Sequence, residues 1–373
     1  MDRRLRVAIV AASLRILGGH SVQAERLLHG WADDPRVEAW LVPIDPVPRS
    51  PFDRLLRVKY LRTIVTQLCY WPRLLAQVAR ADVVHVFSAS YTSFLLAPLP
   101  AVLVARLLGR PIVLNYHSGE APDHLRRSRL ARLVLRRWVH VNAVPSAFLR
   151  EVLERFAIAA HVVPNTIDLK RFSYRVRDPL GPHLLSTRNL EPIYNVACTL
   201  RAFARIQARH PRATLTLVGA GSQETSLRAL ARELGLRGVT FAGRIQPSDM
   251  PRYYDAADIY VQTPDVDNMP LSLLEAFASG LPAVSTAVGG VPAILAHGEQ
   301  GLFAPAGKDD AVAAQIETLL DAPSYARQLA AAAHDSCSRY AWSAARERWL
   351  EVYEAALAAA GKPLRASAAE QTA

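Results

Sequence analysis

Cysteine is scarce in this sequence, which has three among 373 residues. Cys69, Cys198 and Cys337 are odd in number and far apart, so they form no disulfide framework and no Cys-x-x-Cys zinc pair. We therefore expect a reducing compartment. With 51% apolar residues and scattered prolines and glycines, the composition also excludes collagen, coiled-coil and globally disordered proteins.

Membrane-spanning segments are also lacking. The stretch 83–105 carries no formal charge, but His85, several Ser and Thr residues, Pro98 and Pro100 interrupt it. No run of the roughly 18 apolar residues that a spanning helix needs is left. The apolar run 6–12 is short, and we interpret it as a first strand and not as a signal peptide. The sequence predicts a soluble protein, or one bound peripherally to a membrane.

Positive charge is present in excess but is unevenly spread. The net charge is +11, of which residues 1–175 contribute +13 and residues 176–373 contribute −2. A basic half joined to a near-neutral half indicates that the first half meets an anionic partner. The length suits two domains of ordinary size.

Short apolar segments alternate with amphipathic helical segments along the whole chain. The expected strands are 6–13, 37–44, 82–88, 111–117, 139–146, 183–187, 213–219, 239–242, 259–262 and 283–286. Helical periodicity lies between them, as in 195–209 and 223–234. This alternation is typical of βαβ units with parallel sheets.

The alternation restarts near residue 176, after a Pro- and Gly-containing linker. We predict an α/β protein with two doubly wound, Rossmann-like domains that face each other across a ligand cleft. The expected boundaries are 1–175 for an acceptor-binding domain and 176–343 for a nucleotide-sugar-binding domain. A helix at 344–360 is expected to pack back on the first domain, and 361–373 to form a disordered tail.

Two glycine loops follow predicted strands. Gly18 and Gly19 come after the first strand, where glycine allows close backbone approach and the next helix offers free amides to an anion. An ordinary tight turn is the alternative. Gly219-Ala220-Gly221 follows a strand of the second domain, but it lacks the third glycine of a dinucleotide fingerprint, and no acidic residue ends the next strand. A nicotinamide enzyme is therefore not expected, and no Walker A sequence is present.

One carboxylate is isolated in an apolar region. From Asn268 to Gly298 the only formally charged residue is Glu275, within a short helix that Pro270 and Gly280 are expected to bound. An exposed position on the helix surface is the simplest explanation. Asp267 lies eight residues upstream, however, and two carboxylates around a helix N-terminus can hold ligand hydroxyls while the helix amides face phosphates.

The pattern Asp267-x7-Glu275, followed by Ala-Phe-Ala-Ser-Gly-Leu-Pro and then Gly289-Gly290, resembles the donor-binding signature of the GT-B retaining glycosyltransferases. This is the type of glycosyltransferase family 4 and of the group 1 glycosyl transferases. The family usually has glutamate where Asp267 stands. Further matches follow in the expected order: Gly18-Gly19, His117 at a strand end, Pro164-Asn165-Thr166-Ile167-Asp168, and Arg188 after the first strand of the second domain.

The resemblance implies a role for each matching residue. Glu275 would accept hydrogen bonds from the ribose, and Asp267 would hold hydroxyls of the transferred sugar. Arg188 would neutralise the leaving diphosphate, and His117 would lie beside the reacting sugar. The implied catalytic residues are thus His117, Arg188, Asp267 and Glu275. The implied donor contacts are Gly18, Gly19, Arg188, Gly219, Arg244, Asp267, Met269, Pro270, Leu271 and Glu275.

The sequence departs from the family at one position. A lysine normally follows the arginine by several residues, but here Tyr194 stands near that place. A phenol can donate to a phosphate but cannot offset its charge, so Arg244 or Arg201 is considered as a compensating cation.

Asp265-Val266-Asp267 is also a D-x-D, the metal motif of a different glycosyltransferase fold. Its position before the Glu275 helix makes Asp265 incidental. We therefore expect neither a metal ion nor another cofactor.

A basic segment in the first half points to the second partner. Arg126, Arg127, Arg129, Arg132, Arg136 and Arg137 alternate with leucines and Trp138, and 54–68 is a second basic, apolar segment. As a helix the first segment would suit an anionic membrane surface with a lipid-linked or phosphate-bearing acceptor; a solvated surface is the alternative. Nucleic acid is not expected, because aromatic residues are not interleaved with the basic ones as a stacking platform requires.

The sequence thus predicts a retaining glycosyltransferase of the hexosyltransferase class that moves a sugar from a UDP- or GDP-sugar to an acceptor hydroxyl. The expected acceptor is a lipid-linked or cell-surface glycan, and the expected location is the cytoplasm or the inner face of the plasma membrane. Two alternatives stay open: a nucleotide-sugar epimerase of similar fold, and a non-catalytic nucleotide-sugar-binding protein.

Overall fold

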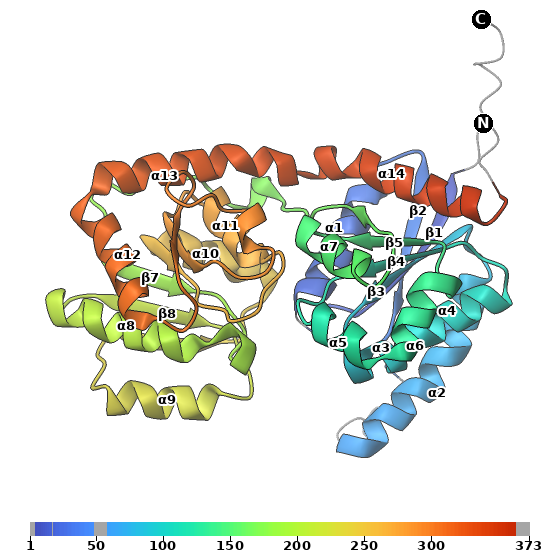
Figure 1. Ribbon diagram of the computed structural model, residues 1–373, viewed down its shortest axis with the longest axis horizontal. Helices are drawn as coiled ribbons and strands as arrows, with labels where there is room; N and C mark the ends of the chain where they lie inside the picture. The colour runs from blue at the N-terminus through green and yellow to red at the C-terminus, as the bar shows by residue number, and fades with distance from the viewer. Residues whose placement is uncertain (1–3, 17, 48–57, 363–373) are drawn as a thin grey trace, which may run out of the picture. The chain divides into compact units, whose positions relative to one another are not determined.

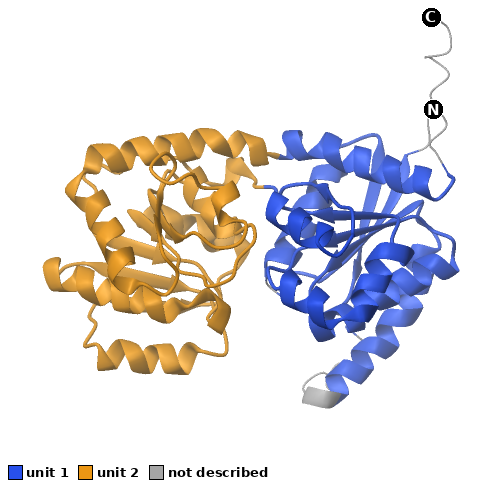
Figure 2. Ribbon diagram, viewed as in Figure 1, with its two compact units in different colours: residues 1–166, 342–373 blue, residues 167–341 orange. Residues whose placement is uncertain are grey.

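The computed structural model describes residues 4–16, 18–47 and 58–362. The chain forms two compact units: unit 1 comprises residues 1–166 and 342–373, and unit 2 comprises residues 167–341 (Figure 2). The first boundary thus lies nine residues before the predicted one. The reason is packing, because Ile167 and Phe172 are buried in a core of unit 2 and the Ile167 N–H donates to the Tyr340 carbonyl at 2.9 Å.

Unit 1 is a six-stranded parallel sheet with strand order β2-β1-β3-β4-β5-β6 (Figure 1). Its strands are β1 (Leu5–Ala11), β2 (Val37–Pro43), β3 (Val83–Ser88), β4 (Ile112–Tyr116), β5 (Val141–Val144) and β6 (His161–Val162). Its helices are α1 (Gly19–Ala32), α2 (Lys59–Val78), α3 (Tyr91–Leu96), α4 (Pro98–Leu107), α5 (Ala121–Arg127), α6 (Arg129–Leu133), the π-helical turn η2 (Val134–Trp138), α7 (Ala147–Glu154) and α14 (Trp342–Ala359).

Unit 2 is a second six-stranded parallel sheet, with strand order β12-β11-β10-β7-β8-β9. Its strands are β7 (His183–Ser186), β8 (Thr214–Val218), β9 (Val239–Gly243), β10 (Ile259–Val261), β11 (Ala283–Thr286) and β12 (Leu302–Ala304). Its α-helices are α8 (Val196–Arg209), α9 (Glu224–Glu233), α10 (Met250–Ala256), α11 (Leu271–Ala278), α12 (Asp309–Asp321) and α13 (Pro323–Ser336). Short 3-10 turns are η3 (Leu169–Arg171), η4 (Pro192–Tyr194), η5 (Pro247–Asp249), η6 (Val291–Ala293) and η7 (Cys337–Tyr340).

Each sheet has a point where the strand order reverses. In unit 1 the chain crosses back from β2 to place β3 beside β1, and in unit 2 it crosses back from β9 to place β10 beside β7. In doubly wound sheets, ligands bind outside the carboxyl ends of the strands at such a switch point. The loops that follow β1 and β3 in unit 1, and β7 and β10 in unit 2, are therefore the places to look for a site.

All ten strands predicted from the sequence are present. The inner strands β3, β4, β5, β10 and β11 are short apolar runs buried throughout, whereas β2 and β9 lie at sheet edges and are partly exposed. Two strands were missed, β6 and β12. They have two and three residues and lie at the sheet edges. The uncharged stretch 83–105 is divided among β3, α3 and α4. Among the described residues, no helix is long and apolar enough to cross a membrane.

The basic segment 126–137 is not the single helix that its composition suggested. Ser128 ends α5 and caps α6, where its hydroxyl accepts from the Ala131 N–H at 3.1 Å, and a π-turn follows over η2. The second basic segment, predicted at 54–68, begins outside the described residues, and its described part lies in α2.

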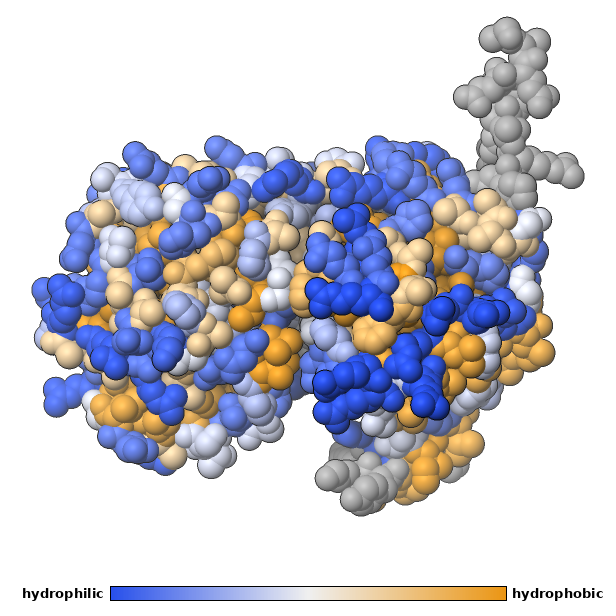
Figure 3. Space-filling view, in the orientation of Figure 1, coloured by the Kyte–Doolittle hydropathy of each residue, from blue (hydrophilic) through white to orange (hydrophobic). Residues whose placement is uncertain are grey.

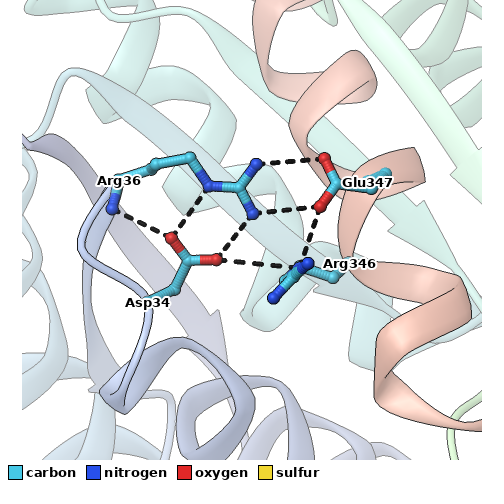
Figure 4. A network of polar contacts seen from close by, with 4 residues as sticks. All are labelled: Asp34, Arg36, Arg346 and Glu347. Atoms are coloured by element: carbon cyan, nitrogen blue, oxygen red, sulfur yellow. Dashed lines mark hydrogen bonds and ion pairs between the residues drawn. The ribbon is translucent and has the colours of Figure 1, made fainter.

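Helix α14 packs against the sheet of unit 1. Its Trp342 ring meets Trp31 edge to face at 4.8 Å between centroids. Figure 4 shows the polar contact that anchors it, in which the Arg36 guanidinium bridges Asp34, at 2.7 Å, and Glu347 of α14, at 3.0 Å. The Arg36 hydrogen bond lowers the pKa of Asp34, so this contact persists at neutral pH. Beyond the helix, Lys362 is still tied down, because its Nζ donates to the Gly109 carbonyl at 2.7 Å; residues 363–373 lie outside the described residues.

Candidate functional site

The switch point of unit 2 brings together two residues that are 79 positions apart. Arg188 follows β7 and Asp267 follows β10, and these strands are neighbours. An Arg188 Nη donates to an Asp267 carboxylate oxygen at 2.7 Å, and each side chain is only about a tenth exposed. The other Nη donates to the Ser272 hydroxyl on α11 at 3.0 Å. The topology thus builds a buried ion pair beside the start of α11.

The Tyr194 ring packs against the guanidinium group of this ion pair. The Arg188 guanidinium lies over the Tyr194 ring at 4.1 Å from its centroid, a cation–π contact. The tyrosine that stands near the expected lysine therefore holds the arginine in place. Burial lowers the pKa of Arg188, but the Asp267 carboxylate and nearby tyrosine hydroxyls together outweigh burial, so the net shift of its pKa is upward. Arg188 is a permanent cation.

One donor of Arg188 is unused. Its Nε is buried and has no hydrogen-bond partner among the described residues. An orphaned guanidinium N–H in a buried place costs free energy unless a ligand satisfies it. Burial also raises the pKa of the Asp267 carboxyl. The positive charge of Arg188 and the hydrogen bond from the Asn268 N–H lower this pKa, but they offset only part of the effect of burial. A ligand oxygen at this place could accept a hydrogen bond from the Arg188 Nε–H.

Glu275 lies on α11 and is held by Tyr254 of α10. The Tyr254 hydroxyl donates to a Glu275 carboxylate oxygen at 2.9 Å, and it lies 2.8 Å from the Thr187 hydroxyl. Glu275 is half-buried, so the simple alternative of an exposed surface glutamate is wrong. Ser272 links the two carboxylates into one polar cluster, because its hydroxyl accepts from Arg188 and its carbonyl oxygen lies 3.3 Å from the Tyr254 hydroxyl.

Two glycines shape the loops of this cluster. Gly219 has φ +140°, and a Cβ there would meet the Arg188 carbonyl oxygen. A Cβ on Gly290 would meet the Asn268 carbonyl oxygen. Larger residues at these two positions would displace the loops that carry Arg188 and Asp267. Gly219, predicted to contact the donor, is thus placed against the backbone of the loop carrying Arg188.

The remaining predicted donor contacts lie close by in the chain or follow a neighbouring strand. Met269 is buried, Pro270 precedes α11 as its N-cap, and Leu271 begins the helix, whose first amides have no acceptor within the helix. Arg244 is exposed and directly follows Gly243 of β9, whose carbonyl accepts from the Gly219 N–H at 2.8 Å. Arg201 is exposed on α8.

Asp265 has a structural partner of its own. Its carboxylate accepts from the Asn195 side-chain amide at 3.0 Å, and Asn195 caps α8 with φ +43°. Among the residues that the structure describes, no group of three or more His, Cys, Asp or Glu side chains is arranged to hold a metal ion.

The switch point of unit 1 holds different residues. Gly19 begins α1, and the Gly18 N–H donates to the Ser21 hydroxyl at 3.1 Å. His117 follows β4, and its ring lies 5.3 Å from that of His20 and 5.2 Å from Phe87 at the end of β3. Burial holds the pKa of His117 well below its ordinary value, so its imidazole is neutral.

Asn115, which lines the same small cavity as His117, belongs to a chain of hydrogen bonds through His85 to Tyr353. His85, fully buried in β3, contacts the Tyr353 hydroxyl of α14 at 2.9 Å and the Asn115 side-chain amide at 3.1 Å. The Asn115 Oδ1 and the His117 Nε2 are buried without partners in the described part of the chain, and both residues line one cavity of about 10 Å³. That is about the volume that holds one water molecule.

Several residues of these clusters gave no sequence signal that we recognised. Tyr254, Ser272 and Thr187 complete the polar cluster of unit 2, and Asn115 lies beside His117. Each is an ordinary polar residue at a strand end or on a helix. Only Thr187 could have been found, because it directly precedes Arg188 at the end of a predicted strand.

The matches with protein families cover both units. The family described as Glycosyltransferase Family 4 matches residues 18–171, and the family described as Glycosyl transferases group 1 matches residues 177–336. The chain belongs to the group 1 glycosyltransferases. This confirms two predictions, a glycosyltransferase of the group 1 type and a GT-B fold built from two doubly wound units.

This glycosyltransferase resembles relatives from plants and bacteria. It is 26% identical over 329 residues to sulfoquinovosyl transferase SQD2 of Arabidopsis thaliana, a match that spans 80% of this chain and 62% of the plant protein. It is 29% identical over 298 residues to glycogen synthase of Mycobacterium tuberculosis, spanning 74% of this chain and 69% of that protein.

Among solved structures, Anabaena HepE in complex with UDP-glucose superposes with a TM-score of 0.75 at 18% identity, covering 93% of this chain and 99% of that chain. At this identity the likeness concerns the fold.

Proposed function

We propose that this protein transfers a sugar from a nucleotide diphosphate-sugar to an acceptor hydroxyl. The observation that carries the proposal is the buried Arg188–Asp267 ion pair at the switch point of unit 2, with the Arg188 Nε–H unsatisfied. A diphosphate oxygen is the acceptor that this N–H lacks, and guanidinium groups suit phosphate geometry. Loss of a nucleoside diphosphate is the step in which charge develops, so a permanent cation there stabilises the transition state.

The other residues take positions around that step. Asp267 already accepts from Arg188 and from the Asn268 N–H at 2.9 Å, and a carboxylate has further lone pairs for a sugar hydroxyl. Glu275, oriented by Tyr254, would accept from the ribose. Met269, Pro270 and Leu271 would turn the start of α11 toward the diphosphate. In the family that the chain belongs to, such sites support a front-face displacement without a covalent enzyme intermediate, and we propose the same retaining outcome here.

A UDP-sugar is the first donor to test, because HepE is described with UDP-glucose; a GDP-sugar is the second. In unit 1, Gly18 and Gly19 would contact the donor and the neutral His117 would lie beside the reacting sugar, as the family resemblance implies. The net charge of +13 over residues 1–175 supports a lipid-linked or cell-surface glycan acceptor at an anionic membrane surface.

No metal ion is proposed to act, because Arg188 supplies positive charge at the leaving group and Asp265 is occupied by Asn195. We expect transfer to survive EDTA. Complete loss of transfer that manganese restores would contradict this assignment.

The deciding experiment follows donor consumption with and without a lipid extract. A transferase releases the nucleoside diphosphate only with acceptor, an epimerase releases it without one, and a binding protein consumes no donor. Glu275→Ala should abolish donor binding in calorimetry. Asp265→Asn is the matched control, since it removes a nearby carboxylate that the proposal does not use. Unchanged donor affinity in Glu275→Ala, or lost transfer in Asp265→Asn, would overturn the proposed roles.

A further inference from the structure

An arginine-lined hollow lies on the surface of unit 1. None of its residues belongs to the switch point described above. Its volume is about 580 Å³. Five arginines line it: Arg106 from α4, Arg129 and Arg132 from α6, and Arg136 and Arg137 from η2. Leu133 and Trp138 complete the lining. We call this surface the arginine hollow. η2 continues α6 and packs beside α4. The guanidinium groups of three elements therefore line the same hollow.

The arginines of the hollow are not neutralised. The two arginines just before it, Arg126 and Arg127, both form ion pairs with Asp123, at 2.6 and 2.8 Å. Within the described residues, the structure records no such ion pair for Arg106, Arg129, Arg136 or Arg137. Four guanidinium groups around one hollow repel one another unless an anion lies among them.

The positive field of the hollow extends to its neighbours. His140 lies just beyond η2. Burial lowers its pKa, and the charges of Arg106 and Lys362 lower it further. Arg132 is turned partly inward, where it donates to the Leu125 and Arg126 carbonyls, so it stiffens the wall of the hollow.

Apolar side chains are exposed around the same surface. On α4, Leu103 is 40% exposed and Leu107 is 78% exposed, on either side of Arg106 in sequence. On α6, Leu130 is 39% exposed and directly follows Arg129, and Leu133 is 46% exposed and directly follows Arg132. Figure 3 shows hydrophobic and strongly hydrophilic side chains interleaved over this part of unit 1. A soluble phosphate needs only the arginines, whereas a phospholipid presents a phosphate and an apolar region together.

We propose that the arginine hollow binds the phosphate group of an anionic membrane phospholipid while the exposed leucines of α4 and α6 enter the interface beside it. This goes beyond general attraction of a basic unit to a membrane, because it assigns a lipid phosphate to defined side chains. It involves Arg106 of α4, which the sequence pattern did not single out, and it leaves out Arg126 and Arg127. It uses unit 1 alone and does not require the proposed transfer reaction.

The test compares two double variants with the same change in charge. Arg136→Gln/Arg137→Gln removes two charges from the hollow, and Arg126→Gln/Arg127→Gln removes two charges next to it. Binding is measured by sedimentation with vesicles of phosphatidylglycerol in phosphatidylcholine at near-physiological salt. General surface attraction scales with charge near the membrane, so it would weaken both variants equally. The proposal requires the hollow variant to lose roughly tenfold more affinity than the adjacent variant, on the scale of lost charge-assisted hydrogen bonds.

A second arm separates a lipid from a free anion. Leu107→Ser/Leu130→Ser should weaken vesicle binding several-fold, as expected from lost apolar burial, while binding of inorganic phosphate to the hollow stays unchanged. Equal losses in the two arginine variants, absence of vesicle binding by the unmodified protein, or insensitivity of vesicle binding to the leucine variant would each overturn the proposal. Since all the substituted side chains are exposed, circular dichroism should show unaltered folding.

Discussion

The two units share a six-stranded parallel sheet with a reversed strand order, but their switch points carry different chemistry. In unit 2 the loops after β7 and β10 meet in a buried ion pair, Arg188 with Asp267. In unit 1, Gly18 and Gly19 follow β1 and lead into α1, which carries His20. The imidazole of His20 lies beside that of His117, which follows β4. Burial keeps these imidazoles neutral, with the pKa of His20 lowered to about 4.

The difference shows how one topology can divide two tasks. In the reaction that we propose, the leaving diphosphate needs a permanent cation, which Arg188 of unit 2 would supply. The neutral imidazoles of unit 1 would add no second positive charge to the one that develops on the transferred sugar. In unit 1 the permanent charge lies instead on the outer helices α4 to η2, where the arginine hollow is. The first prediction removes the ion pair of unit 2. The second uses low pH to protonate a buried, neutral histidine of unit 1, His85.

The largest effect is expected from Arg188→Met. Transfer should fall about 10²–10³-fold, as when one stabilising donor is removed from a transition state. Because Asp267 is left buried without its partner, unit 2 should also lose about 3–5 kcal/mol of unfolding free energy. All six tryptophans, at positions 31, 40, 71, 138, 342 and 349, lie in unit 1. Tryptophan fluorescence therefore reports on unit 1 alone, whereas circular dichroism reports on both units. A transition seen by circular dichroism but not by fluorescence is the unfolding of unit 2.

The double variant Arg188→Met/Asp267→Leu separates folding from function. Replacing both charges with apolar groups should restore most of the lost stability, but transfer should stay as low as in Arg188→Met. If the double variant recovered transfer as well, the ion pair would serve folding only and the proposed role of Arg188 would be wrong.

The second effect is a pH dependence of unit 1. Burial lowers the pKa of His85 to about 3, whereas the unfolded chain has the ordinary value near 6.5. Above pH 6.5 the imidazole is neutral in both states and contributes nothing. As the pH falls below 6.5, only the unfolded chain takes up the proton, so the free energy of unfolding decreases. By pH 4 the loss from His85 alone is about 3 kcal/mol.

His85→Gln keeps hydrogen-bonding capacity without this titration. Denaturant unfolding followed by tryptophan fluorescence should show that the variant loses about 3 kcal/mol less than the unmodified protein between pH 7 and pH 4. Identical pH profiles of the two proteins would show that His85 is not held neutral by burial. Unit 2 supplies a contrast in sign: the charge of Arg188 does not change in this range, and the raised pKa of the Asp267 carboxyl means that its folded form takes up a proton more readily than the unfolded chain as the pH falls.

The fold was largely predictable because its elements are specified locally. A buried parallel strand is a short apolar run wherever it occurs, so the strands 5–11 and 259–261 could be found without knowing their neighbours. β6 and β12 were missed because two or three residues at a sheet edge carry no pattern. The basic segment was predicted as one helix because composition does not reveal that Ser128 caps a new one.

The candidate site was predictable only where the family pattern names residues. Asp267, Glu275 and Arg188 were found in this way. Tyr254 was not, because its contact with Glu275 depends on how α10 packs beside α11, which is a tertiary property. The role of Tyr194 was likewise invisible: a missing lysine suggested lost charge, whereas the structure shows the ring supporting Arg188.

The smallest expected effect compares one buried tyrosine hydroxyl in each unit. In unit 2 the Tyr254 hydroxyl donates to Glu275, and in unit 1 the Tyr353 hydroxyl contacts His85. Tyr254→Phe and Tyr353→Phe should each cost about 1 kcal/mol of stability, the usual value of such a hydrogen bond. Only Tyr254→Phe should weaken binding of the nucleotide-sugar, by about tenfold if the freed Glu275 loses its orientation. Calorimetry with UDP-glucose measures the difference. Equal affinities in the two variants would mean that Glu275 does not depend on Tyr254, whereas weaker binding in Tyr353→Phe would mean that the His85–Tyr353 contact, which we expect to stabilise unit 1 only, also supports donor binding.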